Sequence, residues 1–448
     1  MPRWWRTAGS GTLYGMTTPA SDSGPRRRAL LAATALATVG VGAAQPRAVA
    51  APAARRVRPP RVRLTLPAPT GPYPVGTVSH RLVDHDRPDP WVASRPSREL
   101  MVSVRYPARD VERYPRAAQM SPGEAAGFDR LNNFGGVPRG SVDWAATRTF
   151  AHQGAPPART RRGAAHPRVH PEVHPVARPV VLYSPGVGDP RSLGTTLTDE
   201  LASRGYVVVC VDHTYDASAV EFPDGRIETT RLPEEYERAE REGTVVELLR
   251  KTCAVRVADL RFVLDRLEAI VPAPFAPSVI GAFGQSAGGF AALQTMHDDR
   301  RIAAAANLDG LLAYVQEDQD PGPLSTVAAD GVDRPVLLMG KDGNDHHTVP
   351  SWGALWEHGS GPRLDLTLLG SGHASYTDAT SMLPRIAERL GLPKEVVTGA
   401  IGTVAPERAV AVQRAYVPAF FDRELRHRDD AGLLDGPSAR YPELRFVG

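Results

Sequence analysis

Residues 278–298 read SVIGAFGQSAGGFAALQTMHD, and this stretch decides the fold. A short apolar run leads into Gly284-Gln285-Ser286-Ala287-Gly288, and an Ala-rich helical pattern follows at once. A serine in G-x-S-x-G between a strand and a helix is typical of a nucleophile elbow, in which the hydroxyl stands above a sheet. The turn is tight, so the neighbours of the serine need to lack side chains. The helix N-terminus behind it favours negative charge.

The same alternation of short apolar runs and helical patterns extends on both sides of this stretch. Continuous apolar strands separated by helices indicate a mostly parallel sheet covered on both faces, in an α/β fold. A hairpin is expected around Asp224-Gly225 within EFPDGRIETT. The predicted strands lie at 98–108, 179–186, 206–213, 278–284, 303–310, 335–340 and 363–370, and the predicted helices at 195–205, 255–270 and 287–298.

The N-terminus carries the pattern of an export signal. Arg26–Arg28 precede a weakly apolar stretch, and Ala48-Val49-Ala50 supplies small residues for a signal peptidase. The arginine run resembles a twin-arginine signal, so we expect export machinery as a partner, cleavage near Ala50 and a secreted protein. Residues 51–75, rich in Pro, Ala and Arg, are expected to be a flexible linker, and residues 76–448 a single catalytic domain.

The net charge and the cysteine content bear on two questions: whether the protein binds nucleic acid and whether it contains a disulfide. The net charge of the chain is +3, and the first 50 residues hold six Arg and one Asp, so the mature chain would carry −2. This balance gives no support for a nucleic-acid partner. The two cysteines are Cys210, in an apolar run, and Cys253. Buried free thiols are the simpler interpretation, and spacing alone leaves a disulfide open.

A Pro/His-rich insertion at about residues 152–178 contains His166, His170 and His174 at intervals of four. Each of the three precedes a proline, which favours extended backbone. We therefore interpret the segment as a surface insertion rather than a metal site, because a stable site needs a rigid second shell. No metal and no organic cofactor is expected.

A nucleophilic serine needs a base and an acid, which in this architecture follow it in the chain. His373 follows the last predicted strand through a Gly-Ser-Gly turn and is the expected base, whereas His346 and His347 precede that strand. Two positions for the acid stay open from the residues alone. Asp309 ends the strand after the elbow, and Asp342 and Asp345 end the next one.

Two backbone amides are expected to form an oxyanion hole. One belongs to Ala287, directly after the nucleophile, and the other to the loop after an earlier strand. The glycine-rich sequence SPGVGD at 184–189 is that loop, and Val187 lies between its two glycines. The charged segment from Asp216 to Cys253 is expected either to border the site entrance or to be a solvated excursion.

Several motifs together resemble the platelet-activating-factor acetylhydrolase-like family of α/β-hydrolases over residues 65–425. They are LPAPTGPYPVGTVSHRLVD (66–84), RELMVSVRYPA (98–108), the run from Ser184 to Ser218, GQSAGG (284–289), ANLDG (306–310) and GSGHASYTD (370–378). The resemblance implies an α/β-hydrolase fold and a serine carboxylic-ester hydrolase acting on short-acyl or lipid esters, with transient contact to lipid surfaces. It also implies Ser286, Asp309 and His373 as catalytic residues and Val187 and Ala287 as oxyanion donors.

The chain departs from the family pattern at two positions. Gln285 precedes the serine where family members often have His, and Pro185-Gly186 stands where a His-Gly pair is common. The Ser-Pro-Gly loop also resembles cutinase-like lipases and polyester hydrolases, which take the acid from the next strand. A hydrolase fold without catalysis, acting as a binding module, is a further alternative, although every expected site residue is present.

Overall fold

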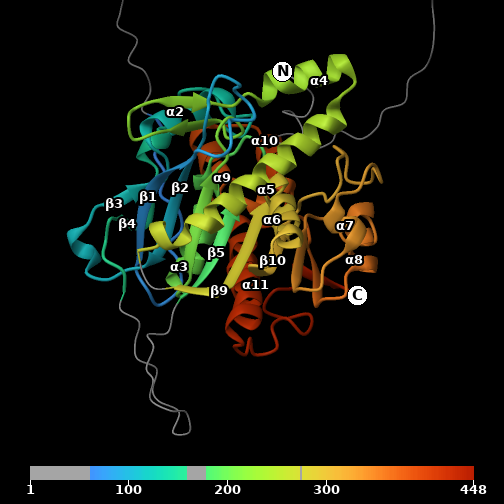
Figure 1. Cartoon of the computed structure of the whole chain (residues 1–448). Coiled ribbons are helices and arrows are strands. Elements are labelled where there is room, and N and C mark those ends of the chain that lie inside the picture. Colours follow the sequence, from blue (N-terminus) through green and yellow to red (C-terminus); the bar gives the residue numbers. More distant parts are fainter. Residues whose placement is uncertain (1–60, 159–177, 273–274) are drawn as a thin grey trace, which may run out of the picture. The chain divides into compact units, whose positions relative to one another are not determined.

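The computed structural model describes residues 61–158, 178–272 and 275–448, which belong to one compact unit (Figure 1). In this part of the chain the strands are β1 (Val75–Asp84), β2 (Arg98–Pro107), β3 (Arg116–Ala118), β4 (Arg148–Gln153), β5 (Arg178–Ser184), β6 (Val207–Asp212), β7 (Ala219–Glu221), β8 (Ile227–Thr229), β9 (Phe275–Gln285), β10 (Ile302–Leu308), β11 (Val336–Gly340), β12 (Arg363–Leu368) and β13 (Leu444–Val447). The α-helices are α2 (Pro122–Leu131), α3 (Thr195–Ser203), α4 (Leu232–Glu242), α5 (Val245–Ile270), α6 (Ala287–Asp298), α7 (Thr326–Asp330), α8 (Pro350–His358), α9 (Ala379–Leu390), α10 (Lys394–Ile401) and α11 (Pro406–Arg426). Short 3-10 helices are η1 (Val111–Arg113), η2 (Trp144–Ala146), η3 (Arg191–Gly194) and η4 (His373–Tyr376).

The described strands build one large sheet with the order β13-β12-β11-β10-β9-β5-β6-β2-β1-β4-β3, plus the separate hairpin β7-β8. From β6 to β12 all neighbours are parallel, whereas β2 and β13 pair antiparallel at the two sides of this parallel core. The predicted mostly parallel sheet is confirmed. The hairpin is confirmed too, with Gly225 at φ +82° in its turn.

Both faces of the sheet are buried, which explains the continuous apolar runs in the sequence. Val180 and Leu182 of β5 face a core built with α5, α6 and α8, and Val181 and Tyr183 face a second core built with α3 and α11. Side chains alternate across a strand, so a strand buried on both sides has apolar residues at every position. In Figure 1 the long helix α5 crosses in front of the sheet, together with α6.

Two boundaries differ from the sequence-based expectation. Residues 61–75 were expected to continue a flexible linker, yet Val62, Leu64 and Leu66 are 3–5% exposed and pack with α9 and α10. Their period-2 apolar spacing was hidden among the surrounding Arg and Pro residues. Helix α5 begins at Val245 rather than at 255, because its first turns pack against Trp91 and α4 instead of the sheet.

Other expectations fall partly or wholly outside the described residues. The export signal at 1–50, the first part of the linker and the three spaced histidines of the insertion lie there. Both cysteines lie in the described part as buried free thiols, and burial raises the pKa of Cys210 to about 11 and that of Cys253 to about 12.

A carboxylate from far along the chain caps helix α3. The N-cap of α3 is Gly194, which has no side chain to accept from the first turn. Asp378, just before α9, accepts from the backbone N–H groups of Thr195 and Thr196 at 2.9 Å, and from the Gln119 side chain at 2.7 Å. Its carboxylate is 1% exposed and so is closed to water. Asp378 therefore joins α3 to the segment that carries His373.

We expect Asp378→Ala to lower the free energy of unfolding by on the order of 3 kcal/mol, because three buried donors lose their acceptor. Urea denaturation measures the change. Asp330→Ala is the matched control: the Asp330 side chain is 61% exposed, so the change should stay within about 0.5 kcal/mol. Equal unfolding midpoints for the two variants would contradict this account of the cap.

Candidate active site

Ser286 lies at the joint between β9 and α6, at the carboxyl end of the parallel strands. Its backbone has φ 55° and ψ −127°, a conformation rarely adopted by a residue with a side chain. The structure holds this strained geometry from both sides. The N–H of Ser286 donates to Leu308 O at 2.9 Å, and its carbonyl accepts from Phe290 N at 3.1 Å. Ser286 thus has the geometry expected of an elbow.

The glycines around Ser286 are required by contact with neighbouring backbone. A Cβ on Gly284 would lie 2.4 Å from Ser184 O, and one on Gly288 only 2.0 Å from the same atom. A Cβ on Gly289 would lie 2.0 Å from Asn307 Oδ1. These distances are far below van der Waals contact, so a side chain would force the elbow apart from β5 and β10. This agrees with the steric role expected from the sequence.

His373 and Asp309 come together although 64 positions separate them. His373 begins η4, after β12, and Asp309 follows β10. The imidazole Nδ1 lies 2.5 Å from Asp309 Oδ2. The Asp309 side chain is fully buried, whereas the His373 side chain is 32% exposed. The carboxylate is therefore enclosed, and the imidazole reaches toward the open side of the site.

The surroundings of Asp309 favour its ionised form. Its Oδ1 accepts from the N–H of Lys341 at 3.0 Å and from Asn344 Nδ2 at 2.9 Å. Burial by itself would raise the pKa of Asp309, but the hydrogen bond with His373 and the charge of Lys341 outweigh burial and lower the pKa below its ordinary value. The sequence reasoning missed Lys341 and Asn344. The signal available was their place after β11, the strand next to β10.

The rival acids and bases make other contacts. Asp342 is exposed at the surface. Asp345 pairs with Arg445 at 2.9 Å and accepts from the backbone amides of the two residues that follow His346. His346 is itself bonded to Asp365 at 2.7 Å. Asp309 is therefore the acid that the structure brings to His373.

Gln285 contacts the other side of the imidazole. Its amide Nε2 donates to the backbone carbonyl of His373 at 3.2 Å, and it lies 3.1 Å from His373 Nε2. A carbonyl accepts only from the NH₂ end of the amide, so the same NH₂ faces the ring. The ring nitrogen is then the acceptor, and the proton sits on Nδ1, toward Asp309. Within the described residues no hydrogen bond joins Ser286 to His373, and catalytic hydrogen bonds often tighten only with substrate present.

The two expected oxyanion donors belong to the elbow and to the loop that packs against it. Ala287 is the first residue of α6, where backbone N–H groups have no partner within the helix. Val187 lies in the loop after β5 that contacts the elbow glycines. Among the described residues neither amide donates to another backbone or side-chain group. Both N–H groups are thus free to donate to a negative oxygen of a substrate.

The side chain of Val187 packs against the excursion that follows β6. It contacts a cluster (the Trp91 cluster) that contains Trp91, Tyr236 of α4 and Leu248 of α5. The segment from Asp216 to Cys253 therefore contacts the loop that carries Val187, one of the two expected oxyanion donors, while its place at the site entrance stays a prediction. Its helix α4 keeps an exposed charged face as well.

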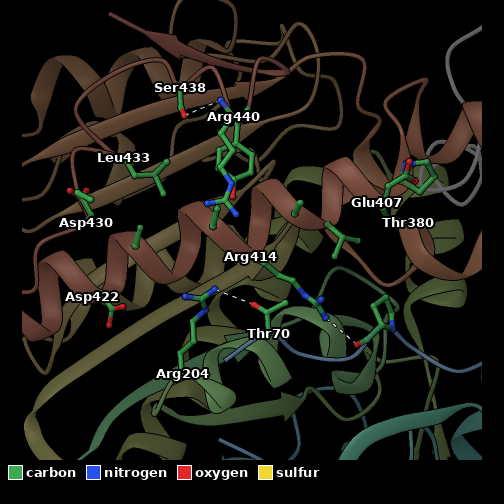
Figure 2. A pocket seen from close by; sticks show the side chains of 18 of the residues that line it. Thr70, Arg204, Thr380, Glu407, Arg414, Asp422, Asp430, Leu433, Ser438 and Arg440 are labelled. Carbon is green, nitrogen blue, oxygen red and sulfur yellow. Dashed lines mark hydrogen bonds between the residues drawn. The ribbon is translucent and has the colours of Figure 1, made fainter. Parts of the chain in front are cut away.

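A large pocket lies away from these residues. It has a volume of about 1110 Å³ and is lined by α11 and the C-terminal loop, with Arg414, Arg204 and Thr70 at one wall (Figure 2). Arg414 donates to the backbone carbonyls of Pro67 and Ala68 at 3.1 and 2.8 Å. None of the predicted site residues lines this pocket.

The described residues contain no cluster of His, Cys, Asp or Glu able to hold a metal ion. The histidines at 166, 170 and 174 lie outside those residues. In the ranges that the structure covers, no helix is long and apolar enough to span a bilayer.

Comparison with known proteins agrees with the fold and with the residue pattern. Residues 168–270 match the family described as platelet-activating factor acetylhydrolase, isoform II. A probable 1-alkyl-2-acetylglycerophosphocholine esterase from Arthroderma benhamiae is 30% identical over 275 residues, which cover 60% of this chain and 66% of that protein.

A solved structure gives the wider match. A ferulic acid esterase from Streptomyces cinnamoneus is 37% identical, with a TM-score of 0.67, over 86% of this chain and 99% of that one. Together with the parallel sheet and the elbow serine, these matches decide the family. The chain belongs to the platelet-activating factor acetylhydrolase-like family of α/β-hydrolases, a family of carboxylic-ester hydrolases.

Proposed function

We propose that this member of an esterase family hydrolyses short-acyl carboxylic esters with a catalytic triad of Ser286, His373 and Asp309. The contact of 2.5 Å between His373 Nδ1 and the buried carboxylate of Asp309, beside the elbow serine, is the observation that carries the proposal. A histidine paired with an acid through Nδ1 keeps Nε2 free to take a proton.

The reaction runs through an acyl-enzyme. The Ser286 hydroxyl attacks the ester carbonyl, and its proton passes to His373 Nε2. Asp309 stabilises the imidazolium that forms and does not itself take the proton. The imidazolium then protonates the alcohol oxygen as the ester bond breaks. Water repeats the sequence on the acylated serine and releases the carboxylic acid.

The negative oxygen of each tetrahedral intermediate binds to the amides of Val187 and Ala287. Donors fixed in place before the reaction stabilise this charge without reorganising, and one such donor contributes about 3 kcal/mol to lowering the barrier. Gln285 releases His373 Nε2 when the nucleophile approaches, because one ring nitrogen cannot accept both protons. No cofactor is needed for these steps.

The names of two relatives support the proposed substrate class. The Arthroderma benhamiae relative is named for 1-alkyl-2-acetylglycerophosphocholine, an acetyl ester of a phospholipid, so we propose short-acyl esters of platelet-activating-factor type first. The Trp91 cluster behind Val187 supports a short acyl group, since bulky side chains fill the space beside the oxyanion loop.

An aromatic acyl group is the second candidate. It is favoured by the ferulic acid esterase, whose sequence is more similar to this chain and matches over more of its length. Cutinase-like hydrolysis of long-chain or polymeric esters remains a third class. It would require acceptance of long acyl chains. Transient contact with lipid surfaces belongs to the first candidate as well, because 1-alkyl-2-acetylglycerophosphocholine is a lipid with a short acyl group.

We expect Ser286→Ala to abolish hydrolysis of 4-nitrophenyl acetate and Asp309→Asn to lower kcat by roughly 10⁴-fold, because the asparagine no longer fixes the imidazole tautomer. Asp342→Asn is the matched control, an exposed aspartate after the neighbouring strand, and should keep kcat within about twofold. Initial rates at fixed pH provide the comparison. Equal rates for Ser286→Ala and the unchanged chain would refute the nucleophile, and a larger loss in Asp342→Asn than in Asp309→Asn would refute the acid.

A panel of esters separates the substrate classes. We expect kcat/KM to fall from 4-nitrophenyl acetate to butyrate and to be lowest for laurate, with measurable release of acetate from 1-alkyl-2-acetylglycerophosphocholine. Methyl ferulate tests the aromatic candidate, and polyester film tests the cutinase-like one. A maximum at laurate or activity on film would overturn the short-acyl proposal, and a preference for methyl ferulate would replace it by the second candidate.

We also propose that the protein is exported by the twin-arginine machinery and secreted after cleavage near Ala50. The basic run Arg26–Arg28 and the small residues before Ala50 support this proposal. Replacing all three arginines by lysine should retain uncleaved precursor in the cells. Mass spectrometry of the medium decides the matter: mature protein that starts near residue 51 is expected from the unchanged chain, and equal export of the lysine variant would contradict the proposal.

A further inference from the structure

A buried ion pair lies directly beneath the loop that follows β5. Arg256 belongs to α5 and Asp216 follows β6, and each is 1% exposed. Arg256 Nε donates to Asp216 Oδ2 at 2.7 Å and Arg256 Nη2 to Asp216 Oδ1 at 2.8 Å. This is the two-bond geometry in which a planar guanidinium fits a carboxylate, and it fixes the orientation of both side chains.

The same pair binds three backbone groups of the loop. Arg256 Nη1 donates to Pro185 O at 2.6 Å, and Arg256 Nη2 donates to Gly186 O at 3.1 Å. Asp216 Oδ1 accepts from the backbone N–H of Gly188 at 3.0 Å. The contacts therefore lie before and after the residue between the two glycines. All of these groups are closed to water, so an unmade contact would leave a buried polar atom unpaired.

Because the peptide bond is planar, these contacts also fix the orientation of the Val187 N–H. The carbonyl of Gly186 and the N–H of Val187 belong to one trans peptide unit, in which they point in opposite directions. Arg256 holds that carbonyl on the buried side, so the N–H of Val187 points away from Arg256. Asp216 fixes the next peptide unit in the same way, through the N–H of Gly188. The orientation of the Val187 amide is thus set from both sides.

We propose that Arg256 and Asp216 are positioning residues for the oxyanion hole, which hold the Val187 N–H in the direction needed by the tetrahedral intermediate. The inference rests on the proposed function, since it assigns Val187 as a donor. Neither residue touches the substrate. The two residues should stabilise the charged transition state more than they stabilise the bound neutral ester. Only the negative oxygen of the transition state depends strongly on the direction of the Val187 N–H.

The test is Arg256→Lys in the full chain, which keeps a positive charge but loses the planar fork. We expect kcat for 4-nitrophenyl acetate to fall by about 100-fold, as after loss of one oxyanion donor, while KM changes by less than about threefold. Amide hydrogen exchange in the peptide covering 184–189 should become faster by at least about tenfold. A purely structural role would lower stability without this split between kcat and KM.

Arg105→Lys is the matched control. Arg105 is a second buried arginine, 5% exposed, whose partners Asp199 and Thr195 belong to α3. In the described part of the chain its side-chain hydrogen bonds go to these two residues of α3, not to residues 184–189. We expect a loss of stability comparable to that of Arg256→Lys, with kcat and exchange of the loop within about twofold of the unchanged chain. An equal fall of kcat in both variants would overturn the proposal.

Asp216→Asn keeps the test decisive if Arg256→Lys does not fold. It leaves an oxygen for the Gly188 amide and removes the charge pairing together with the acceptor of Arg256 Nε. We expect a smaller fall of kcat, about tenfold, with faster exchange of the loop. Unchanged kcat and unchanged exchange would overturn the proposal. If the unchanged chain hydrolyses no ester, the proposed function fails, and exchange of the loop in the same variants still decides whether the pair holds it.

Discussion

The close approach of two backbone turns governs the architecture of this protein. The loop after β5 and the turn after β9 meet so tightly that a Cβ on Gly288 would lie 2.0 Å from Ser184 O. Backbone cannot yield as a flexible side chain can, so the two turns act as one rigid unit. The proposed nucleophile Ser286 and the proposed oxyanion donor Val187 belong to that unit. Parallel pairing of β9 with β10 and of β11 with β12 then brings the ends of the neighbouring strands to the same edge.

Behind this edge the fold buries several charged side chains. Arg98, with no exposed surface, bonds to Asp89 and Asp259, and Asp259 continues to His213, whose ring reaches Ser184 at the end of β5. Burial alone would raise the pKa of Asp259, but the charge of Arg98 and the hydrogen bonds with His213 and Arg98 together outweigh burial and lower it. Removing one member would leave an uncompensated buried charge, which is costly. A buried network of ion pairs and hydrogen bonds therefore lies beneath the candidate site, although apolar clusters cover the two faces of the sheet.

The sequence was informative where chemistry depends on local pattern. The elbow serine, the glycines beside it and the mostly parallel sheet follow from turn chemistry and periodicity within short windows, whereas the order of the strands in the sheet comes from the structure. The choice between Asp309 and Asp342 did not follow from the residues alone, because both end strands at the same edge and only the course of η4 decides which one meets His373.

Two further features were invisible in the sequence for different reasons. Arg256 sits in a helical repeat where an arginine normally marks the solvent face, and only tertiary packing turns it inward. The apolar residues Val62, Leu64 and Leu66 were masked by the surrounding Arg and Pro, so composition suggested a linker where the structure has a packed segment. In both cases a long-range contact overrides a local signal.

Asp378 and Arg414 form hydrogen bonds with residues that come much earlier in the chain. Asp378 caps a helix that starts at residue 195, and Arg414 bonds to backbone at residues 67 and 68, more than 300 positions earlier. Such pairings carry a large loop-closure entropy, and folds rich in them form slowly. During synthesis the nucleophile turn leaves the ribosome well before the residues that tie α3 and the N-terminal segment in place. A nascent chain therefore contains most of the candidate site residues before their geometry can form, because that geometry also needs the contacts of Asp378 and Arg414, which are added later.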